Sequence, residues 1–309
     1  MMPQVISASR RTDIPAFYTE WFTCRLRAGS VVVRQPYSGR YTAVSLAPED
    51  VAAFVFWSKN YAPLLSRLEQ VEQISKNLFF HYTITGNREL EPEVPDPRDA
   101  IRDYLYLCRR YSSAQVIWRF DPLCMTDKLT YEIHEERFRL CAEQLQGTAQ
   151  RCIISFVHPY KKVLANMARQ GDHRVTDLSP LQKRQYALRL TAWAEHFGIQ
   201  LFSCCNDFLL CESIGKAACI NGNYLSGLFE ADFDMRPASM RKECACTKSV
   251  DIGAYDTCAH GCLYCYANTD KDRARAAMLR HDPAWNALNG YVPEEKIGAS
   301  PKKQGALFH

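Results

Sequence analysis

The chain has 309 residues, of which 47% are hydrophobic and 23% are charged, a balance that excludes extended disorder. Its net charge of +4 is too small to indicate a nucleic-acid-binding protein, and its 14 cysteines exceed what folding requires at this length. The N-terminal residues lack an export signal and no apolar run is long enough to span a membrane, so we expect a cytoplasmic protein without membrane partners. Thiols in that reducing compartment are more often metal ligands, catalytic groups or core residues than disulfides.

Apolar segments typical of β-strands alternate with helical segments along most of the chain. The strands are predicted at Gln4–Ser9, Val31–Gln35, Tyr41–Leu46, Ala53–Ser58, Leu78–Thr85, Gln115–Phe120, Cys152–Val157 and Ile199–Cys204. The second and third of these are joined through the turn Tyr37-Ser38-Gly39. The helices are predicted from Asp13 to Gly29, Asn60 to Lys76, Pro97 to Tyr111, Thr130 to Gly147 and Pro180 to Gly198. Residues 211–234 show no clear period, and we expect an irregular segment with one short helix or strand.

This alternation predicts an α/β fold with a parallel sheet and helical crossovers. We expect a (β/α) barrel, TIM-like or partial, because ionisable residues recur just after the strands, where barrels carry their active sites. The candidate catalytic residues are Arg10, Arg11, Asp13, Lys59, Arg119 and Asp121. Together with Lys161 these cations suit an anionic small-molecule substrate, while the alternative is a set of salt-bridged polar loops. The glycine-rich motifs of dinucleotide-binding folds and P-loop proteins are absent from the sequence.

The most informative segment is a cysteine-rich loop, residues 244–268, which holds Cys244, Cys246, Cys258, Cys262 and Cys265. Thiolates select zinc, copper(I) or iron–sulfur clusters, so this density predicts a metal site. A zinc ion would bind four of these cysteines, Cys244, Cys246, Cys262 and Cys265, and Cys258 would have no role in the site. Alternatively, Cys258-x3-Cys262-x2-Cys265 would hold a [4Fe–4S] cluster with one iron free of protein ligands. Cys244 and Cys246 then supply an additional ligand, bind a second metal, form a redox pair or only pack.

The triad, with Tyr264 before its last cysteine, resembles the cluster motif of the radical S-adenosylmethionine (SAM) superfamily, and especially its spore photoproduct lyase-like members. Nearly the whole chain resembles a bacterial family catalogued as domain of unknown function 1848, which brings no established reaction. The segments that carry this second resemblance are Ser7–Pro15, Phe56–Asn60, Trp118–Pro122 and Asp251–Tyr255.

The superfamily resemblance implies that the open iron of the cluster binds SAM. Reduction by an electron donor would then yield a 5′-deoxyadenosyl radical that abstracts hydrogen from the substrate. It further implies that Tyr264, Tyr266 and Asn268 contact the cofactor. The superfamily usually places its triad after the first barrel strand, so we expect Val250–Tyr255 to lie beside Gln4–Ser9 in a circularly permuted order. A Gly-Gly-Glu-like segment for the SAM amino group is absent from the sequence.

We therefore expect a barrel body at residues 1–243, a cysteine-rich loop on its mouth at 244–268, and a helix with a tail at 269–309. Lys271, Arg273, Arg275 and Arg280 on that helix either contact nucleic acid or form a solvated face. His260 either donates to a cluster sulfur or faces solvent. The vicinal pair Cys204-Cys205 either packs in the core or takes part in metal or redox chemistry. The alternative function is a non-catalytic zinc or iron–sulfur protein with a structural, redox-sensing or nucleic-acid-related role.

Overall fold

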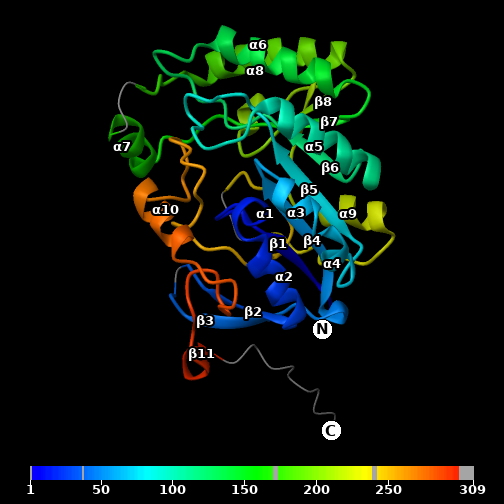
Figure 1. Cartoon of the computed structure of the whole chain (residues 1–309). Coiled ribbons are helices and arrows are strands. Elements are labelled where there is room, and N and C mark those ends of the chain that lie inside the picture. The colour runs from blue at the N-terminus through cyan, green and yellow to red at the C-terminus, as the bar shows by residue number, and fades with distance from the viewer. Residues whose placement is uncertain (1, 37, 170–172, 239–241, 299–309) are drawn as a thin grey trace.

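The computed structural model describes residues 2–36, 38–169, 173–238 and 242–298 (Figure 1). The strands are β1 (Gln4–Ala8), β2 (Ser30–Arg34), β3 (Tyr41–Ser45), β4 (Val51–Ser58), β5 (Leu78–Thr83), β6 (Val116–Arg119), β7 (Arg151–Ile154), β8 (Gln200–Ser203), β9 (Ile214–Lys216), β10 (Val250–Asp251) and β11 (Ile297–Gly298). The α-helices are α1 (Ile14–Phe17), α2 (Thr19–Arg27), α3 (Ala62–Leu65), α4 (Leu68–Glu72), α5 (Pro97–Arg110), α6 (Tyr131–Leu145), α7 (Lys161–Arg169), α8 (Pro180–His196), α9 (Gly222–Phe229) and α10 (Lys271–Leu279).

Eight parallel strands form the main sheet in the order β10-β1-β4-β5-β6-β7-β8-β9. This confirms the α/β class. Of the two forms of barrel expected, the closed, TIM-like one is wrong, because β10 and β9 are the two edges of an open sheet. The strands β2 and β3 pair antiparallel in a small second sheet, with β11 beside β3. Tyr37 of the predicted turn and the tail residues 299–309 lie outside the described residues.

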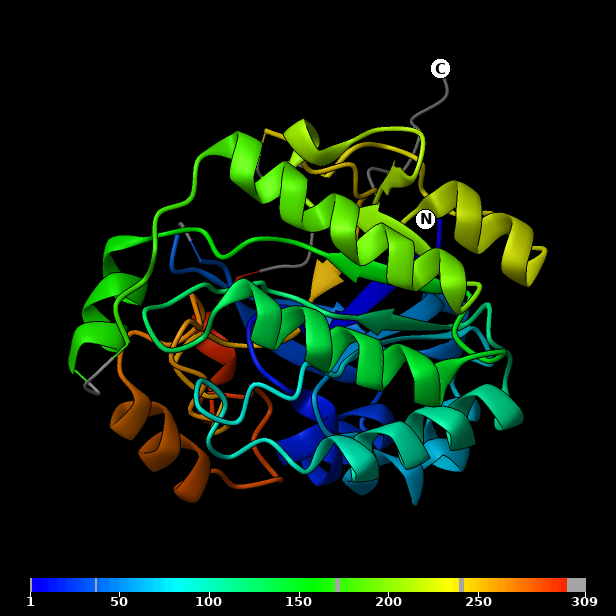
Figure 2. The ribbon, with the colours of Figure 1, turned by 90° about the horizontal axis from the view of Figure 1, so that it is seen from above.

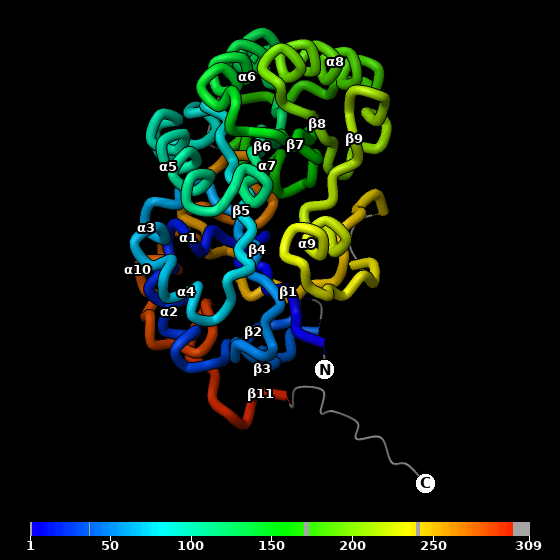
Figure 3. The backbone as a smooth tube through the Cα atoms, turned by 90° about the vertical axis from the view of Figure 1, so that its right-hand side faces the viewer, coloured from blue at the N-terminus to red at the C-terminus, as the bar shows by residue number. Residues whose placement is uncertain are grey.

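Alternate side chains of the main strands pack into two cores, as the period of a strand requires. Ile6, Phe56 and Trp118 join the larger core with the helices α1, α2, α5, α6 and α8. Val55 and Ile117 face the other way, into a core completed by residues of α9 and its flanking segments. Figure 3 shows α6 and α8 side by side and α9 separate from them. Because α9 and its neighbours fill the inner face, the sheet buries its apolar surface without closing.

The strand β10 lies parallel to β1, with Ser7 opposite Asp251, which confirms the expected place of the segment that leads into the cysteines. The Asp251 carboxylate accepts hydrogen bonds from the hydroxyl groups of Ser7 and Ser9, each at 2.7 Å. Gly253 follows directly, and a Cβ there would stand 2.0 Å from Ser9 Oγ. The close approach of the two strand ends therefore requires glycine at this position.

The helices differ from the sequence prediction mainly where the chain turns sharply. The segment Asp13–Gly29 forms two helices that meet at Tyr18, and Asn60–Lys76 forms two that meet at Arg67. The helix α7 was not predicted, and residues 211–234, expected to hold one short helix or strand, contain both α9 and β9. Figures 1 and 2 place α7 beside α10, and Arg169 forms an ion pair with Asp270 there. Within the described residues, we find no helix with the length and apolar character needed to cross a membrane.

Candidate functional site

A cavity of about 310 Å³ opens at the carboxyl ends of the main strands. Its volume is within the range of small-molecule sites. The structure brings to it all six candidate catalytic residues, Arg10, Arg11, Asp13, Lys59, Arg119 and Asp121. The five cysteines of the 244–268 loop also line it, together with Tyr264 and Tyr266. Lys161 does not line it, and its side chain is exposed at the start of α7.

The cysteine triad lies on a loop that is fixed by hydrogen bonds from three directions. The Tyr18 hydroxyl donates to Thr257 O at 2.6 Å, and Asn268 Nδ2 donates to Cys258 O at 2.6 Å. The Leu263 N–H donates to Leu90 O at 2.8 Å. Gly261, between the first two cysteines of the triad, has a φ of +67°, a conformation that favours glycine. These contacts hold the three thiols at one wall of the cavity.

Burial controls the protonation of the triad. Burial, with a smaller effect of Asp13, raises the pKa of Cys258 to about 12. Burial also raises the pKa of Cys262, and the Lys59 ammonium group partly opposes that rise. A metal binds the thiolate form, so loading this site would release protons. Within the described residues, no three His, Cys, Asp or Glu side chains already have the arrangement of a metal-ion site.

Asp13 connects the loop after β1 to the triad loop. Its Oδ2 lies 2.8 Å from His260 Nε2, and its Oδ1 accepts a hydrogen bond from Ser58 Oγ at 2.7 Å. The Ala16 N–H also donates to Oδ1, so the same carboxylate caps α1. The expectation that His260 faces solvent is wrong, because its ring is buried between Asp13 and the carbonyl of Glu93. Asp13 itself pairs with a histidine rather than with an arginine.

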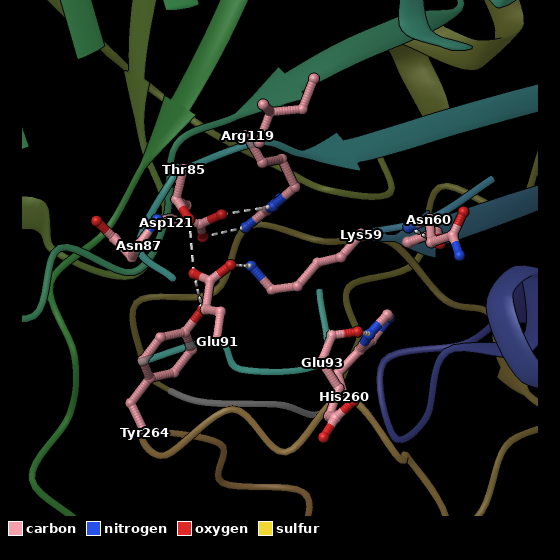
Figure 4. Close-up of polar contacts among 12 residues, drawn as sticks. Lys59, Asn60, Thr85, Asn87, Glu91, Glu93, Arg119, Asp121, His260 and Tyr264 are labelled. Carbon is pink, nitrogen blue, oxygen red and sulfur yellow. Dashed lines mark hydrogen bonds and ion pairs between the residues drawn. The ribbon is translucent and has the colours of Figure 1, made fainter. Parts of the chain in front are cut away.

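A second buried network surrounds Glu91, which sequence reasoning missed. Lys59 Nζ lies 3.0 Å from Glu91 Oε2, and Oε1 of the same carboxylate accepts hydrogen bonds from Thr85 at 2.6 Å and Tyr264 at 2.5 Å (Figure 4). Tyr264 thus joins the triad loop to the end of β5 through Glu91. Nothing in the sequence distinguishes Glu91 from the charged residues around it.

The cations after β1 and β6 have carboxylate partners as well. Arg10 and Arg11 approach Asp251 at 3.6 and 3.8 Å, and Arg119 forms two hydrogen bonds with Asp121, at 2.6 and 3.0 Å. Asp251 is not part of the cavity wall, whereas both arginines after β1 are. The wall therefore presents four cationic side chains and two carboxylates, and each of the four cations has a carboxylate within 4 Å.

The profile of one protein family, described as Domain of unknown function (DUF1848), matches residues 5–267. The chain belongs to this family. Searches of curated proteins and of solved structures found no match. The DUF1848 match contains every residue of the cavity wall, including the triad and the strand-end cations.

Cys244 and Cys246 of this DUF1848 chain do not join the triad. Cys244 shares side-chain hydrogen bonds with Cys205 and Cys246, and Cys246 shares one with Cys219. Cys219 lies in the segment without clear period and was not predicted as a functional residue. A signal was present, because Cys204-Cys205, Cys219 and Cys244-x-Cys246 all lie at or after the end of the predicted strand Ile199–Cys204. Their contact, however, depends on how the segments that carry Cys219 and Cys246 fold.

The three residues expected at the cofactor have different positions in the DUF1848 structure. Tyr264 and Tyr266 line the cavity, and the Tyr266 hydroxyl donates to Arg10 O at 2.8 Å. Asn268 is buried behind the loop, where its carbonyl accepts a hydrogen bond from Asn166 at 3.2 Å. Asn268 therefore holds the loop and does not face the cavity. On α10, Arg273 and Arg275 are exposed while Lys271 is buried.

Proposed function

We propose that this protein is an iron–sulfur enzyme in which Cys258, Cys262 and Cys265 hold a [4Fe–4S] cluster that binds SAM. The observation that carries the proposal is that all three thiols of the triad face the same cavity as the cations after β1, β4 and β6. Three thiolates suit an iron–sulfur cluster and leave one iron open for a ligand. Held by these three cysteines and reduced by an electron donor, such a cluster would supply the one electron that cleaves SAM to methionine and a 5′-deoxyadenosyl radical.

The residues of the chain position and balance charge around this site. Arg11 is held at 3.4 Å from the Gly253 carbonyl and 3.8 Å from Asp251, which leaves donors of its guanidinium group for a carboxylate in the cavity. Lys59 and Arg119 are fixed by Glu91 and Asp121, so their charges have defined positions. We infer that Arg10 and Arg11 bind the SAM carboxylate or an anionic substrate, and that Lys59 balances the charge of the Cys262 thiolate.

The aromatic residues of the loop complete the wall. Tyr264 is fixed by its hydrogen bond to Glu91, and Tyr266 by its bond to the Arg10 carbonyl, so both rings have set orientations. Flat, fixed rings at a cavity wall suit the adenine of SAM. Phe156 and Val157 add apolar surface that limits the access of water.

Anaerobic purification and reconstitution with iron and sulfide test this proposal. We expect a brown protein whose reduced form gives an EPR signal that changes when SAM is added. The C258S/C262S/C265S variant should lose that signal, whereas the matched C24S variant, altered on α2 outside the cavity wall, should keep it. A wild-type protein that binds zinc in place of iron, or a triad variant with an unchanged signal, would contradict the proposal.

A further inference from the structure

Five cysteine side chains from three separate segments meet on the same cavity wall, apart from the triad. The Cys204 sulfur lies 3.9 Å from the Cys205 sulfur and 3.6 Å from the Cys219 sulfur. Cys219 contacts Cys246, Cys246 contacts Cys244, and Cys244 contacts Cys205. The five thiols therefore form one closed series of sulfur–sulfur contacts.

The two sulfur–sulfur distances at Cys204 are close to those between metal ligands, and the five thiols would have to converge further to complete a metal-ion site. Two thiolates on one tetrahedral zinc ion, each about 2.3 Å from the metal, stand about 3.8 Å apart. Four of the five thiols also contact the smaller apolar core, since Cys219 and Cys246 belong to it and Cys204 and Cys244 pack against it. Core packing alone does not explain why they contact one another, because a buried thiol behaves as a small apolar group and has no preference for other thiols. All five also reach the cavity wall, whereas Cys108, Cys141 and Cys152 are buried in the larger core and do not.

A positively charged side chain lies beside the five thiols and can offset the negative charge of their thiolate forms. Arg119 Nη1, buried at the end of β6, donates to the Cys219 sulfur at 3.1 Å. His81 Nε2 lies 2.7 Å from the Cys219 carbonyl and fixes the backbone at that residue. A guanidinium group beside a ligand sulfur offsets the charge of thiolates and is the kind of outer contact that stabilises metal sites.

We propose that Cys204, Cys205, Cys219, Cys244 and Cys246 form a second metal centre for a thiophilic metal, zinc or an iron–sulfur cluster. Each thiol that binds the metal releases one proton and no oxidant is required. The centre faces the cavity from the β8 side, and the triad faces it from the β10 side. The inference does not depend on the proposed function, because the two sets share no cysteine.

The C258S/C262S/C265S variant isolates the second centre. After anaerobic loading with zinc alone or with iron and sulfide, elemental analysis should find metal bound to this variant. Adding C219S and C246S to it should remove that metal, whereas adding C108S, in the apolar core, should not. The loading condition under which the triad variant retains metal, zinc alone or iron and sulfide, identifies the metal that the second centre binds. The proposal would be overturned if the triad variant bound no more zinc or iron than the variant that carries C219S and C246S in addition.

Thiol labelling of the wild-type protein gives a test that does not depend on the folding of variants. Mass mapping after alkylation should show that loaded metal protects the peptides with Cys204, Cys219 and Cys246, while Cys24 reacts equally with and without metal. The triad peptide is measured separately, so failure of the proposed function and failure of the second centre give different patterns. Equal labelling of the five thiols in loaded and metal-free protein would overturn the proposal.

Discussion

His260 lies within the cysteine triad in sequence, and its Nε2 contacts Oδ2 of Asp13 at 2.8 Å across 247 positions of the chain. Both side chains are buried. Since Asp13 also caps α1 and accepts from Ser58 Oγ, one carboxylate joins the ends of β1 and β4 to the triad loop. The orientation of the triad therefore depends on the first strands of the sheet.

We predict that His260→Ala lowers the free energy of unfolding by about 1–3 kcal/mol, because Asp13 loses a buried partner. The same variant should lose iron faster from the reconstituted protein, since its triad loop is less well fixed. Urea unfolding and iron release to a chelator measure the two effects. His196→Ala, on the exposed side of α8, is the control. Equal stability of the two variants would contradict this role of His260.

Gly253 should not tolerate a side chain. Gly253→Ala places a Cβ 2.0 Å from Ser9 Oγ, so β10 must move away from β1. We expect poor folding, and in the folded fraction a loss of metal binding. Gly227→Ala on α9 is the matched control, because a Cβ there meets nothing within 4 Å, and alanine should stabilise the helix by about 0.5–1 kcal/mol. Thermal unfolding of both variants distinguishes these outcomes. A Gly253→Ala protein as stable as the wild type would show that Gly253 does not have to lie so close to Ser9.

Two glutamates in the loop after β5 should differ in their contribution to stability. Glu91→Ala leaves the buried Nζ of Lys59 without its anion, and breaking such a pair costs about 3–5 kcal/mol. Glu89→Ala removes an exposed partner of Arg137 and should cost less than about 1 kcal/mol. Urea unfolding measures the difference. If Glu91→Ala costs no more than Glu89→Ala, the buried network does not stabilise the fold.

His134 should make stability depend on pH. Burial lowers the pKa of His134 from 6.5 to about 4, and its Nε2 lies 3.1 Å from the Cys124 carbonyl. Between these pH values the unfolded chain binds the extra proton and the folded chain does not, so stability falls as the pH falls from 6.5 towards 4. One pKa unit is worth about 1.4 kcal/mol, so this contribution approaches about 3 kcal/mol near pH 4.

Urea unfolding between pH 7 and pH 4.5 should therefore show a smaller loss of stability in His134→Gln than in the wild type. His196→Gln should retain the wild-type dependence, because that ring is exposed. Parallel curves for wild type and His134→Gln would show that another group sets the pH dependence in this range.

If SAM binds as proposed, Arg11→Ala should weaken its binding by roughly tenfold or more, because a hydrogen bond to a charged group contributes about 1.5–3 kcal/mol. Calorimetric titration of the reconstituted protein measures this. Arg109→Ala on the exposed side of α5 is the control. An unchanged dissociation constant in Arg11→Ala would remove Arg11 from the SAM site.

Periodicity along the chain predicted most of the sheet and the longer helices. Pro97 and Pro180 begin α5 and α8 as expected, because a proline in the first turn fits the helix and needs no hydrogen-bond partner. The pairing of β10 with β1 was also predicted, from the place of the cysteine motif. The closed barrel was wrong, since the helix α9 fills the inner face and its eight residues show little pattern of their own.

The site could be predicted only in part. Residues that directly follow strands, such as Arg10 and Lys59, reach one cavity because parallel strands end at one edge of the sheet. The partners that fix them, Glu91 and Asp251, are single acidic residues whose role depends on contacts distant in the chain. Cys219 was missed for the same reason, since its contacts with Cys204 and Cys246 join residues that are distant in the chain.

The pairing of Ser7 with Asp251 also means that the main sheet can be completed only late in protein synthesis. These two residues are 244 positions apart, so β1 has a free hydrogen-bonding edge while the rest of the sheet is being made. The triad emerges from the ribosome after the strand that covers this edge. If the triad binds a cluster as proposed, the cluster would enter a cavity whose other walls are already built. A nascent chain that stalls before β10 would expose a strand edge prone to aggregation.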